Sequence, residues 1–375
     1  TDRSTGTLAT QAGGRTIAMG NSHACALTAA GGVACWGYNG RGQLGDGTTT
    51  SRSTPVAVFG LASGVVALGA GPEYSCALTD AGAVKCWGAN NFGQLGDGTT
   101  EERHTPVTVG GLDGGASAIG IGQYHACAVV GGGVRCWGLN GGRLGNGSTD
   151  DSLVPVAAIG LTTDVVAISA AYDHSCALTA TGAVKCWGNN DNGQLGDDGG
   201  GGWRTASDVA GLASGVTVVT VGEYFTCALT DGGAVKCWGR NMYGELGIGS
   251  TETRMTPTDL PTLTSGVRDI GAGLGYACAV MNTGAAKCWG ANGDGRLGSG
   301  STASSTTPVA VSGATDMLTI AVNSGTCALR TTGGAKCWGD DAAGQLGDGD
   351  ATTGGSLVPV DVFGLTGMVR SAATW

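Results

Sequence analysis

The chain has 375 residues, of which 74 are glycine and only 13% are charged. This composition excludes a coiled coil and favours a chain with many tight turns. A phosphate backbone is bound by clustered lysine and arginine. The formal net charge of −10 therefore predicts no nucleic-acid partner. No apolar run reaches the roughly 18 residues that a transmembrane helix needs, so no membrane span is predicted.

The chain begins with a polar stretch, Thr1 to Gly14, that has no initiator methionine. We expect residues 1–14 to be an N-terminal extension left by processing or trimming. Residues 15–375 are expected to form a single domain.

A repeat of about 50 residues fills the rest of the chain. Cys-Trp-Gly recurs seven times, and a second cysteine lies nine or ten residues upstream of each copy. The fourteen cysteines form seven pairs: Cys25 and Cys35, Cys76 and Cys86, Cys127 and Cys136, Cys176 and Cys186, Cys227 and Cys237, Cys278 and Cys288, and Cys327 and Cys337. A fixed period of this length is typical of solenoids and propellers.

Four short segments of each unit have the character of β-strands. In the second unit they are 65–70 (VVALGA), 75–79 (SCALT), 83–88 (AVKCWG) and 105–109 (TPVTV). Apolar and β-branched residues favour strands, and Pro106 suits an outermost edge strand. The repeat therefore predicts an all-β fold, a seven-bladed β-propeller with four antiparallel strands per blade. A linear β-solenoid is the alternative, although its repeats are usually shorter.

The two cysteines of a unit lie in its second and third strands, which form a hairpin. Cys76 and Cys86 are symmetric about Ala81, so they face each other across the ladder. The third unit has a shorter turn, which keeps Cys127 opposite Cys136. Opposed residues can lie about 4.5 Å apart at Cα, within disulfide range, so we predict one disulfide per blade. Buried free thiols are one alternative. Metal sites are another, but two cysteines per unit without a consistent histidine do not fill a tetrahedral shell.

The pattern G-x-x-H-S-C-A-L-T-x-x-G-A-V-K-C-W-G-x-N-x-x-G-Q-L-G-D-G resembles the repeat of the regulator of chromosome condensation family, from about Arg15 to Val362. The resemblance implies a seven-bladed propeller and leaves the function open. Members of that family include a nucleotide-exchange factor, a plant UV-B photoreceptor and a secreted bacterial inhibitor of β-lactamases. The family usually has an aliphatic and a small polar residue where this chain has cysteines. The chain therefore looks like a secreted, disulfide-rich variant of bacterial type.

Three units depart from the pattern. The third is shortened at 131–133 and 140–142. The fourth carries the insert 197–205 and lacks the proline of its last strand. The seventh has Asp341 where the others have an asparagine.

The cysteines also predict a compartment, because disulfides persist where the environment is oxidising. We expect an extracellular, cell-surface or periplasmic protein. Neither a P-loop nor an EF-hand occurs, and no cofactor is predicted. Asp46, Asp97, Asp197 and Asp348 are expected to form Asp-Gly turns, with a weak Ca²⁺ site at Asp197 and Asp198 as the alternative.

The histidines and tryptophans favour packing over chemistry. His23, His125 and His174 each precede a first cysteine by two residues, at a position that holds Tyr, Phe or Gly in other units. The seven tryptophans of Cys-Trp-Gly are expected to pack between blades. Photoreception, suggested by the partial motif 202–205 (GWRT), is the alternative. No Ser-His-Asp set or Gly-x-Ser-x-Gly elbow occurs, so we predict no enzyme.

Two loops of each unit are expected on one face of the ring, one before the first cysteine and one after Cys-Trp-Gly. Tyrosine offers a large contact area with few rotatable bonds. The resemblance implies that the corresponding face grips the partner of the β-lactamase inhibitor. The predicted binding residues are Glu73, Phe92, Tyr124, Tyr172, Asp173, Glu223, Tyr224 and Tyr243. Ordinary exposed loop residues are the alternative.

The pattern of the first strand occurs eight times, at 15–19 before the first blade and again at 367–371. The extra strand either closes the ring or pairs with a neighbouring molecule, which would permit self-assembly. The sequence as a whole predicts a non-enzymatic extracellular scaffold that recognises a protein or a glycan. A structural subunit of an extracellular assembly is one alternative, and a propeller hydrolase or lyase with a channel-mouth site is the other.

Overall fold

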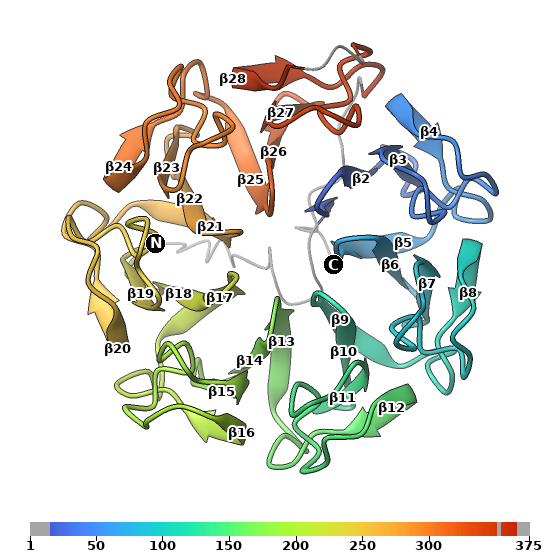
Figure 1. Cartoon of the computed structure of the whole chain (residues 1–375), viewed down its shortest axis with the longest axis horizontal. Helices are drawn as coiled ribbons and strands as arrows, with labels where there is room; N and C mark the ends of the chain where they lie inside the picture. Colours follow the sequence, from blue (N-terminus) through green and yellow to red (C-terminus); the bar gives the residue numbers. More distant parts are fainter. Residues whose placement is uncertain (1–15, 351–353, 366–375) are drawn as a thin grey trace, which may run out of the picture.

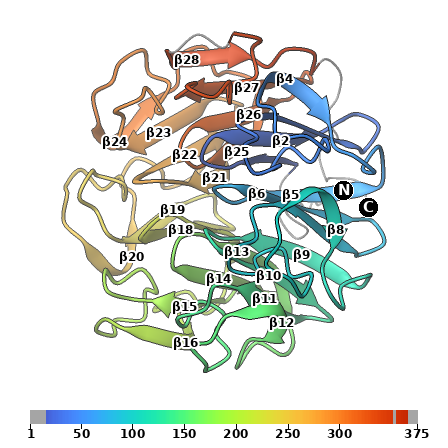
Figure 2. The same cartoon turned by 45° about the vertical axis from the view of Figure 1, so that its right-hand side comes forward.

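The computed structural model describes residues 16–350 and 354–365. Its strands form seven four-stranded antiparallel sheets arranged as blades around a central axis (Figure 1). Each sheet is built from one continuous stretch of chain, with its first strand at the axis and its fourth at the rim (Figures 1 and 2). The predicted seven-bladed propeller is confirmed, and the linear solenoid is wrong.

The strands of blades 1 to 4 have the following bounds. Blade 1 holds β1 Ile17–Met19, β2 His23–Leu27, β3 Val33–Gly37 and β4 Arg52–Ala57; blade 2 holds β5 Val65–Ala70, β6 Tyr74–Thr79, β7 Val84–Gly88 and β8 Arg103–Thr108. Blade 3 holds β9 Ala116–Ile121, β10 His125–Val130, β11 Gly133–Gly138 and β12 Ser152–Ala157; blade 4 holds β13 Val165–Ala170, β14 His174–Thr179, β15 Val184–Asn189 and β16 Trp203–Asp208.

The strands of blades 5 to 7 follow the same order. Blade 5 holds β17 Val216–Val221, β18 Phe225–Thr230, β19 Val235–Gly239 and β20 Arg254–Asp259. Blade 6 holds β21 Val267–Ala272, β22 Tyr276–Met281, β23 Ala286–Gly290 and β24 Ser305–Ala310; blade 7 holds β25 Met317–Val322, β26 Thr326–Arg330, β27 Ala335–Gly339 and β28 Ser356–Asp361. In blade 4, residues 203–205, expected as part of an insert, instead begin the outermost strand.

One disulfide joins the second and third strands of every blade. The paired cysteines are register partners, and their Cα atoms lie 4.0–4.1 Å apart. The shortened hairpin of blade 3 keeps Cys127 opposite Cys136, as its compensating turn predicted. No cysteine is free, so the alternatives of buried thiols and cysteine metal sites are wrong.

The tryptophan of each Cys-Trp-Gly packs between two blades and is fully buried. Its indole N–H donates to a backbone carbonyl in the loop of the preceding blade. The seven pairs are Trp36 to Gln345, Trp87 to Gln43, Trp137 to Gln94, Trp187 to Arg143, Trp238 to Gln194, Trp289 to Glu245 and Trp338 to Arg296, at 2.9–3.0 Å. Beneath Trp137, Gly96 has φ of 68°, and a Cβ there would lie 2.7 Å from the indole nitrogen. The loop glycine is therefore required by the close approach of the ring.

The ring closes through contacts between blade 7 and blade 1. Trp36 of blade 1 donates to the Gln345 carbonyl, and the Gly349 N–H donates to the Ser53 carbonyl at 3.0 Å. All seven sheets are completed by strands between 17 and 361, so closure needs no surplus strand. Residues 367–371 lie outside the described residues, as does the extension 1–14, and strand donation to a neighbour stays a prediction. In the described ranges, no helix is long and apolar enough to cross a bilayer.

The aspartates of the Gly-Asp-Gly loops cap turns, as expected. Asp46 Oδ1 accepts from the Thr48 N–H at 2.9 Å, and Asp97 Oδ1 accepts from the Thr99 N–H at 3.0 Å. Burial of Asp46 opposes its ionisation, but hydrogen bonds led by that of Thr48 outweigh the burial and lower its pKa. Across the described ranges, no cluster of three or more acidic, histidine or cysteine side chains could hold a metal ion.

The loop asparagine bridges the ends of each long loop, and blade 7 departs from this arrangement. In blade 1, Asn39 Nδ2 donates to the carbonyls of Thr48 and Thr50, while its Oδ1 accepts from the Leu44 N–H. Asp341 of blade 7 accepts the equivalent bond from Leu346 but carries no amide donor. Burial, with a smaller contribution from the neighbouring Asp348, raises the pKa of Asp341 to about 6.

We expect Asp341→Asn to stabilise the protein above pH 6. The raised pKa means that the buried carboxyl stabilises the fold when protonated and loses that contribution as pH rises from about 4 to 6. At pH 8 the cost is on the order of 2–3 kcal/mol. Urea unfolding at pH 5 and pH 8 would measure the gain, which should be largest at pH 8. Asn90→Asp, the reverse change in blade 2, should destabilise at pH 8, and equal stability of D341N and wild type at that pH would contradict the assignment.

Candidate functional site

The two loops expected on one face do lie together in the structure. In six blades, a carbonyl of the loop between the first and second strands accepts from the backbone N–H that follows Cys-Trp-Gly. These pairs are Ser22 with Tyr38, Glu73 with Ala89, Tyr124 with Leu139, Asp173 with Asn189, Tyr224 with Arg240, and Gly275 with Ala291, at 2.7–3.0 Å. We call this surface the loop face. Because its backbone is tied in this way, its side chains stand on a fixed frame.

The predicted aromatic residues gather in two clusters on the loop face. Phe92 of blade 2 and Tyr124 of blade 3 have ring centroids 5.0 Å apart. Tyr172 of blade 4 and Tyr224 of blade 5 have centroids 5.5 Å apart, and Tyr243 joins them through a shared arginine. Each cluster spans two adjacent blades, which the sequence alone did not show.

Arg240 organises the cluster of blades 4 and 5, although the sequence did not single it out. Its guanidinium lies 4.7 Å from the ring centroid of Tyr224 and 5.8 Å from that of Tyr243. It donates to Glu223 at 2.6 Å and to Glu245 at 3.0 Å. Burial opposes the charge, but the two carboxylates outweigh it and raise the pKa of Arg240. Cation–π contacts and ion pairs together hold both tyrosines in place.

Two further arginines pair with predicted carboxylates. Arg143 donates from Nε to Asp173 at 2.9 Å and lies 4.8 Å from the ring centroid of Trp203. Arg41 Nε lies 3.9 Å from Glu73, and its Nη1 forms a closer ion pair with Glu102. The predicted acidic residues are therefore ion-paired. The sequence contains one signal for these arginine and carboxylate pairs: Arg143, and Glu245 beside Arg240, replace the usual glutamine of the Gly-Gln-Leu-Gly loop.

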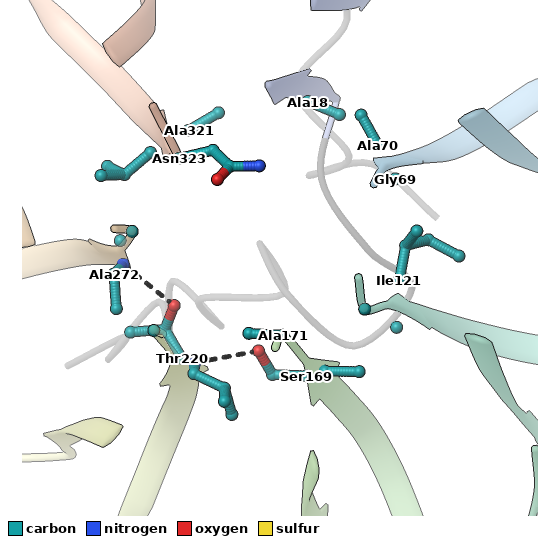
Figure 3. Close-up of a pocket in the computed structure, with 18 of the residues that line it drawn as sticks. Ala18, Gly69, Ala70, Ile121, Ser169, Ala171, Thr220, Ala272, Ala321 and Asn323 are labelled. Carbon is teal, nitrogen blue, oxygen red and sulfur yellow. Dashed lines mark hydrogen bonds between the residues drawn. The ribbon is translucent and has the colours of Figure 1, made fainter. Parts of the chain in front are cut away.

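The innermost strands surround a cavity of about 160 Å³ on the axis (Figure 3). Small side chains such as Ala18, Ala171 and Ala272 line it. The hydroxyl oxygens of Ser169 and Thr220 accept backbone N–H bonds from Val221 and Ala272 of the next blade, at 3.1 and 3.2 Å.

The rim of the cavity is formed by one equivalent residue from each blade: Asn21, Pro72, Gln123, Tyr172, Glu223, Leu274 and Asn323. Glu223 is the one carboxylate among the described residues that line the cavity, and it is paired with Arg240. The cluster of channel carboxylates that would favour a hydrolase or lyase is thus not found among these residues.

Comparisons with known proteins agree with this fold. Models of the regulator of chromosome condensation (RCC1) repeat match residues 15–43, 65–94, 165–194 and 216–245, and also 30–78, 81–129, 132–178 and 233–280. The Ultraviolet-B receptor UVR8 of Arabidopsis thaliana is 32% identical over 82% of this chain and 72% of its own length. The human E3 ubiquitin-protein ligase HERC2 is 31% identical over 74% of this chain, which spans only 6% of that ligase.

A solved structure shows the same architecture. Prp20p from Saccharomyces cerevisiae, described with its binding to Gsp1p and histones, superposes with a TM-score of 0.76 at 20% identity. The match covers 88% of this chain and 85% of that one, and it concerns the fold alone. Repeat matches across more than half of the chain and a relative 32% identical over most of both sequences place this protein in the RCC1 repeat family.

Proposed function

We propose that this protein is an extracellular, non-enzymatic scaffold that recognises a protein partner through the loop face of blades 2 to 5. The observation that carries the proposal is the cluster of Tyr172, Tyr224 and Tyr243 braced by Arg240. Tyrosine and arginine are enriched among the residues that dominate binding energy at protein interfaces. Here they are held in place before any partner arrives, which lowers the entropic cost of binding.

A protein suits this surface better than a glycan. The rings of the two clusters are tilted by 52° and 58° against their neighbours, so they form ridges instead of one flat stacking platform. Exposed Met242 and half-exposed Tyr243 add apolar area beside them. A solved structure of the same fold is described with its binding to Gsp1p and histones, so this architecture can serve protein binding.

The extracellular part of the proposal is supported by the seven disulfides. A reducing cytosol disfavours such bonds. The propeller should therefore meet its partner outside that compartment, either in solution or at a surface.

The test compares two variants of the oxidised protein as bait in its native extracellular fluid. The double variant Tyr172→Ala with Tyr224→Ala should raise the dissociation constant of the complex with the purified partner at least tenfold, as expected for two tyrosines at the centre of an interface. Phe59→Ala is the matched control, because Phe59 is 69% exposed and follows the outermost strand of blade 1, at the opposite end of the blade from the loop face. Equal binding by the double variant with an intact fold would overturn the proposal, and a captured glycan that depends on these tyrosines would replace the protein partner.

A further inference from the structure

A cleft on the loop face lies where blades 1, 2 and 3 meet. Its lining residues are Asn21, Ser22, Tyr38, Pro72, Glu73 and Tyr124. Tyr38 follows β3, Pro72 and Glu73 lie between β5 and β6, and Tyr124 lies between β9 and β10. Two aromatic walls, a proline and one carboxylate thus converge from three blades.

The walls of this cleft are formed in advance of any ligand. The Tyr38 N–H donates to the Ser22 carbonyl at 2.7 Å, and the Glu73 carbonyl accepts from the Ala89 N–H at 2.9 Å. Tyr124 is supported from behind by Phe92, with ring centroids 5.0 Å apart. The tyrosine positions therefore do not depend on closure of a loop.

The charge of the cleft is negative. The side chain of Glu73 is 46% exposed, and its ion-pair partner Arg41 lies 3.9 Å away. That same arginine forms its closer ion pair with Glu102. Two carboxylates share one guanidinium, so one negative charge remains uncompensated beside the aromatic walls.

We propose that this cleft binds a basic side chain, lysine or arginine, of a protein partner. The faces of tyrosine rings attract cations, and an adjacent carboxylate supplies the countercharge. The aliphatic stem of a basic side chain matches Pro72 and the rings, while the carboxylate disfavours anions and gives a purely apolar group no advantage. The assignment rests on the proposed function, since it specifies what the partner brings to the loop face.

The direct test uses small probes that carry a single basic side chain. Nα-acetyl-arginine methylamide and its lysine counterpart should bind with millimolar affinity, and the neutral citrulline analogue should bind at least fivefold more weakly. The chain has seven tyrosines, so selective ¹³C labelling of tyrosine rings gives few signals. Those of Tyr38 and Tyr124 should shift on titration, while the signal of Tyr243 should stay in place.

Variants of the cleft residues test whether the probes bind in this cleft. Glu73→Gln should weaken the cationic probes about fivefold and remove their preference over citrulline. Tyr38→Ala should weaken them similarly. Glu252→Gln is the matched control, because its side chain is 70% exposed in blade 5 and lies outside the cleft. Equal binding of citrulline, or unchanged binding by E73Q, would overturn the assignment.

The probe titration separates this assignment from the proposed function. The probes need no partner, so their failure removes the cleft and leaves the test with Tyr172 and Tyr224 standing. Equal partner binding by the Tyr172 and Tyr224 double variant in that other test, with normal probe binding here, would overturn the proposed function and leave a cation-binding cleft. If the proposed function and the cleft assignment both hold, E73Q should also weaken binding of the purified partner about fivefold at low salt, with a smaller effect at high salt.

Discussion

Removing the disulfides should unfold this propeller under conditions in which the oxidised protein is native. Each bridge closes a loop of nine or ten residues and contributes about 2–3 kcal/mol in the chain-entropy model. Folded proteins are stable by only about 5–15 kcal/mol, so the loss of all seven bridges exceeds that margin even if they are only partly additive. A variant without the fourteen cysteines should lack a cooperative urea transition at 25 °C, as followed by circular dichroism.

Removing the disulfide of a single blade allows its contribution to the free energy of unfolding to be measured. Cys76→Val with Cys86→Ser keeps a similar packed volume in blade 2 and removes the crosslink. It should lower the free energy of unfolding by about 2–3 kcal/mol. Cys76→Ala with Cys86→Ala should cost more, because both positions are fully buried and a cavity is added. If the Val and Ser variant is as stable as wild type, the bridges do not stabilise the fold.

The fold could be predicted from the sequence because every unit repeats the same constraints. The nine-residue spacing of blade 3 is instructive. Its turn shortens by one residue, and the structure indeed keeps Cys127 opposite Cys136. A pairing that survives a change in loop length is specified by the strands themselves. The outermost strand of blade 2 was predicted to start at residue 105, but β8 starts at Arg103. A bulge between Cys86 and Gly88 brings Arg103 into the ladder.

The candidate site was predictable only in part. Loop positions and residue types indicated where the tyrosines lie, because the period of the repeat places equivalent loops on one face. The role of Arg240 could not be found in this way. Its partners Glu223 and Glu245 come from two different loops, and only the tertiary fold brings them to one guanidinium. Tyr38 was missed because it precedes the loop asparagine, Asn39, whereas Phe92 and Tyr243 follow the equivalent asparagines in the same loop of their blades.

Buried histidines join the blades close to the disulfides. Nε2 of His23, His125 and His174 lies 2.8–2.9 Å from the hydroxyl oxygen of Ser75, Ser175 and Thr226, respectively, in the next blade. Phe225 occupies the same position in blade 5, and the residue opposite it in blade 6 is Ala277. The polar and apolar pairs are therefore alternative solutions for one interface.

The histidines should make the propeller unfold in mild acid. Burial lowers the pKa of His23 to about 4 and those of His125 and His174 to about 3. In the unfolded chain these pKa values return to about 6.5, so the unfolded chain binds more protons below that pH. Stability is complete above pH 6.5 and falls as pH drops toward 4. Each histidine costs about 2 kcal/mol at pH 5.

The native Phe225 and Ala277 pair supplies the variant that tests this origin of acid sensitivity. His174→Phe with Thr226→Ala copies that pair into the interface of blades 4 and 5, so it removes one titrating group while preserving the packing. The slope of unfolding free energy against pH between 6.5 and 5 should fall by about one proton. Urea unfolding at intervals of half a pH unit measures that slope. His104→Phe, at an exposed position of β8, should leave it unchanged. A double variant with the wild-type slope would show that His174 does not contribute to the acid sensitivity, because it is the only titrating group altered between the two proteins.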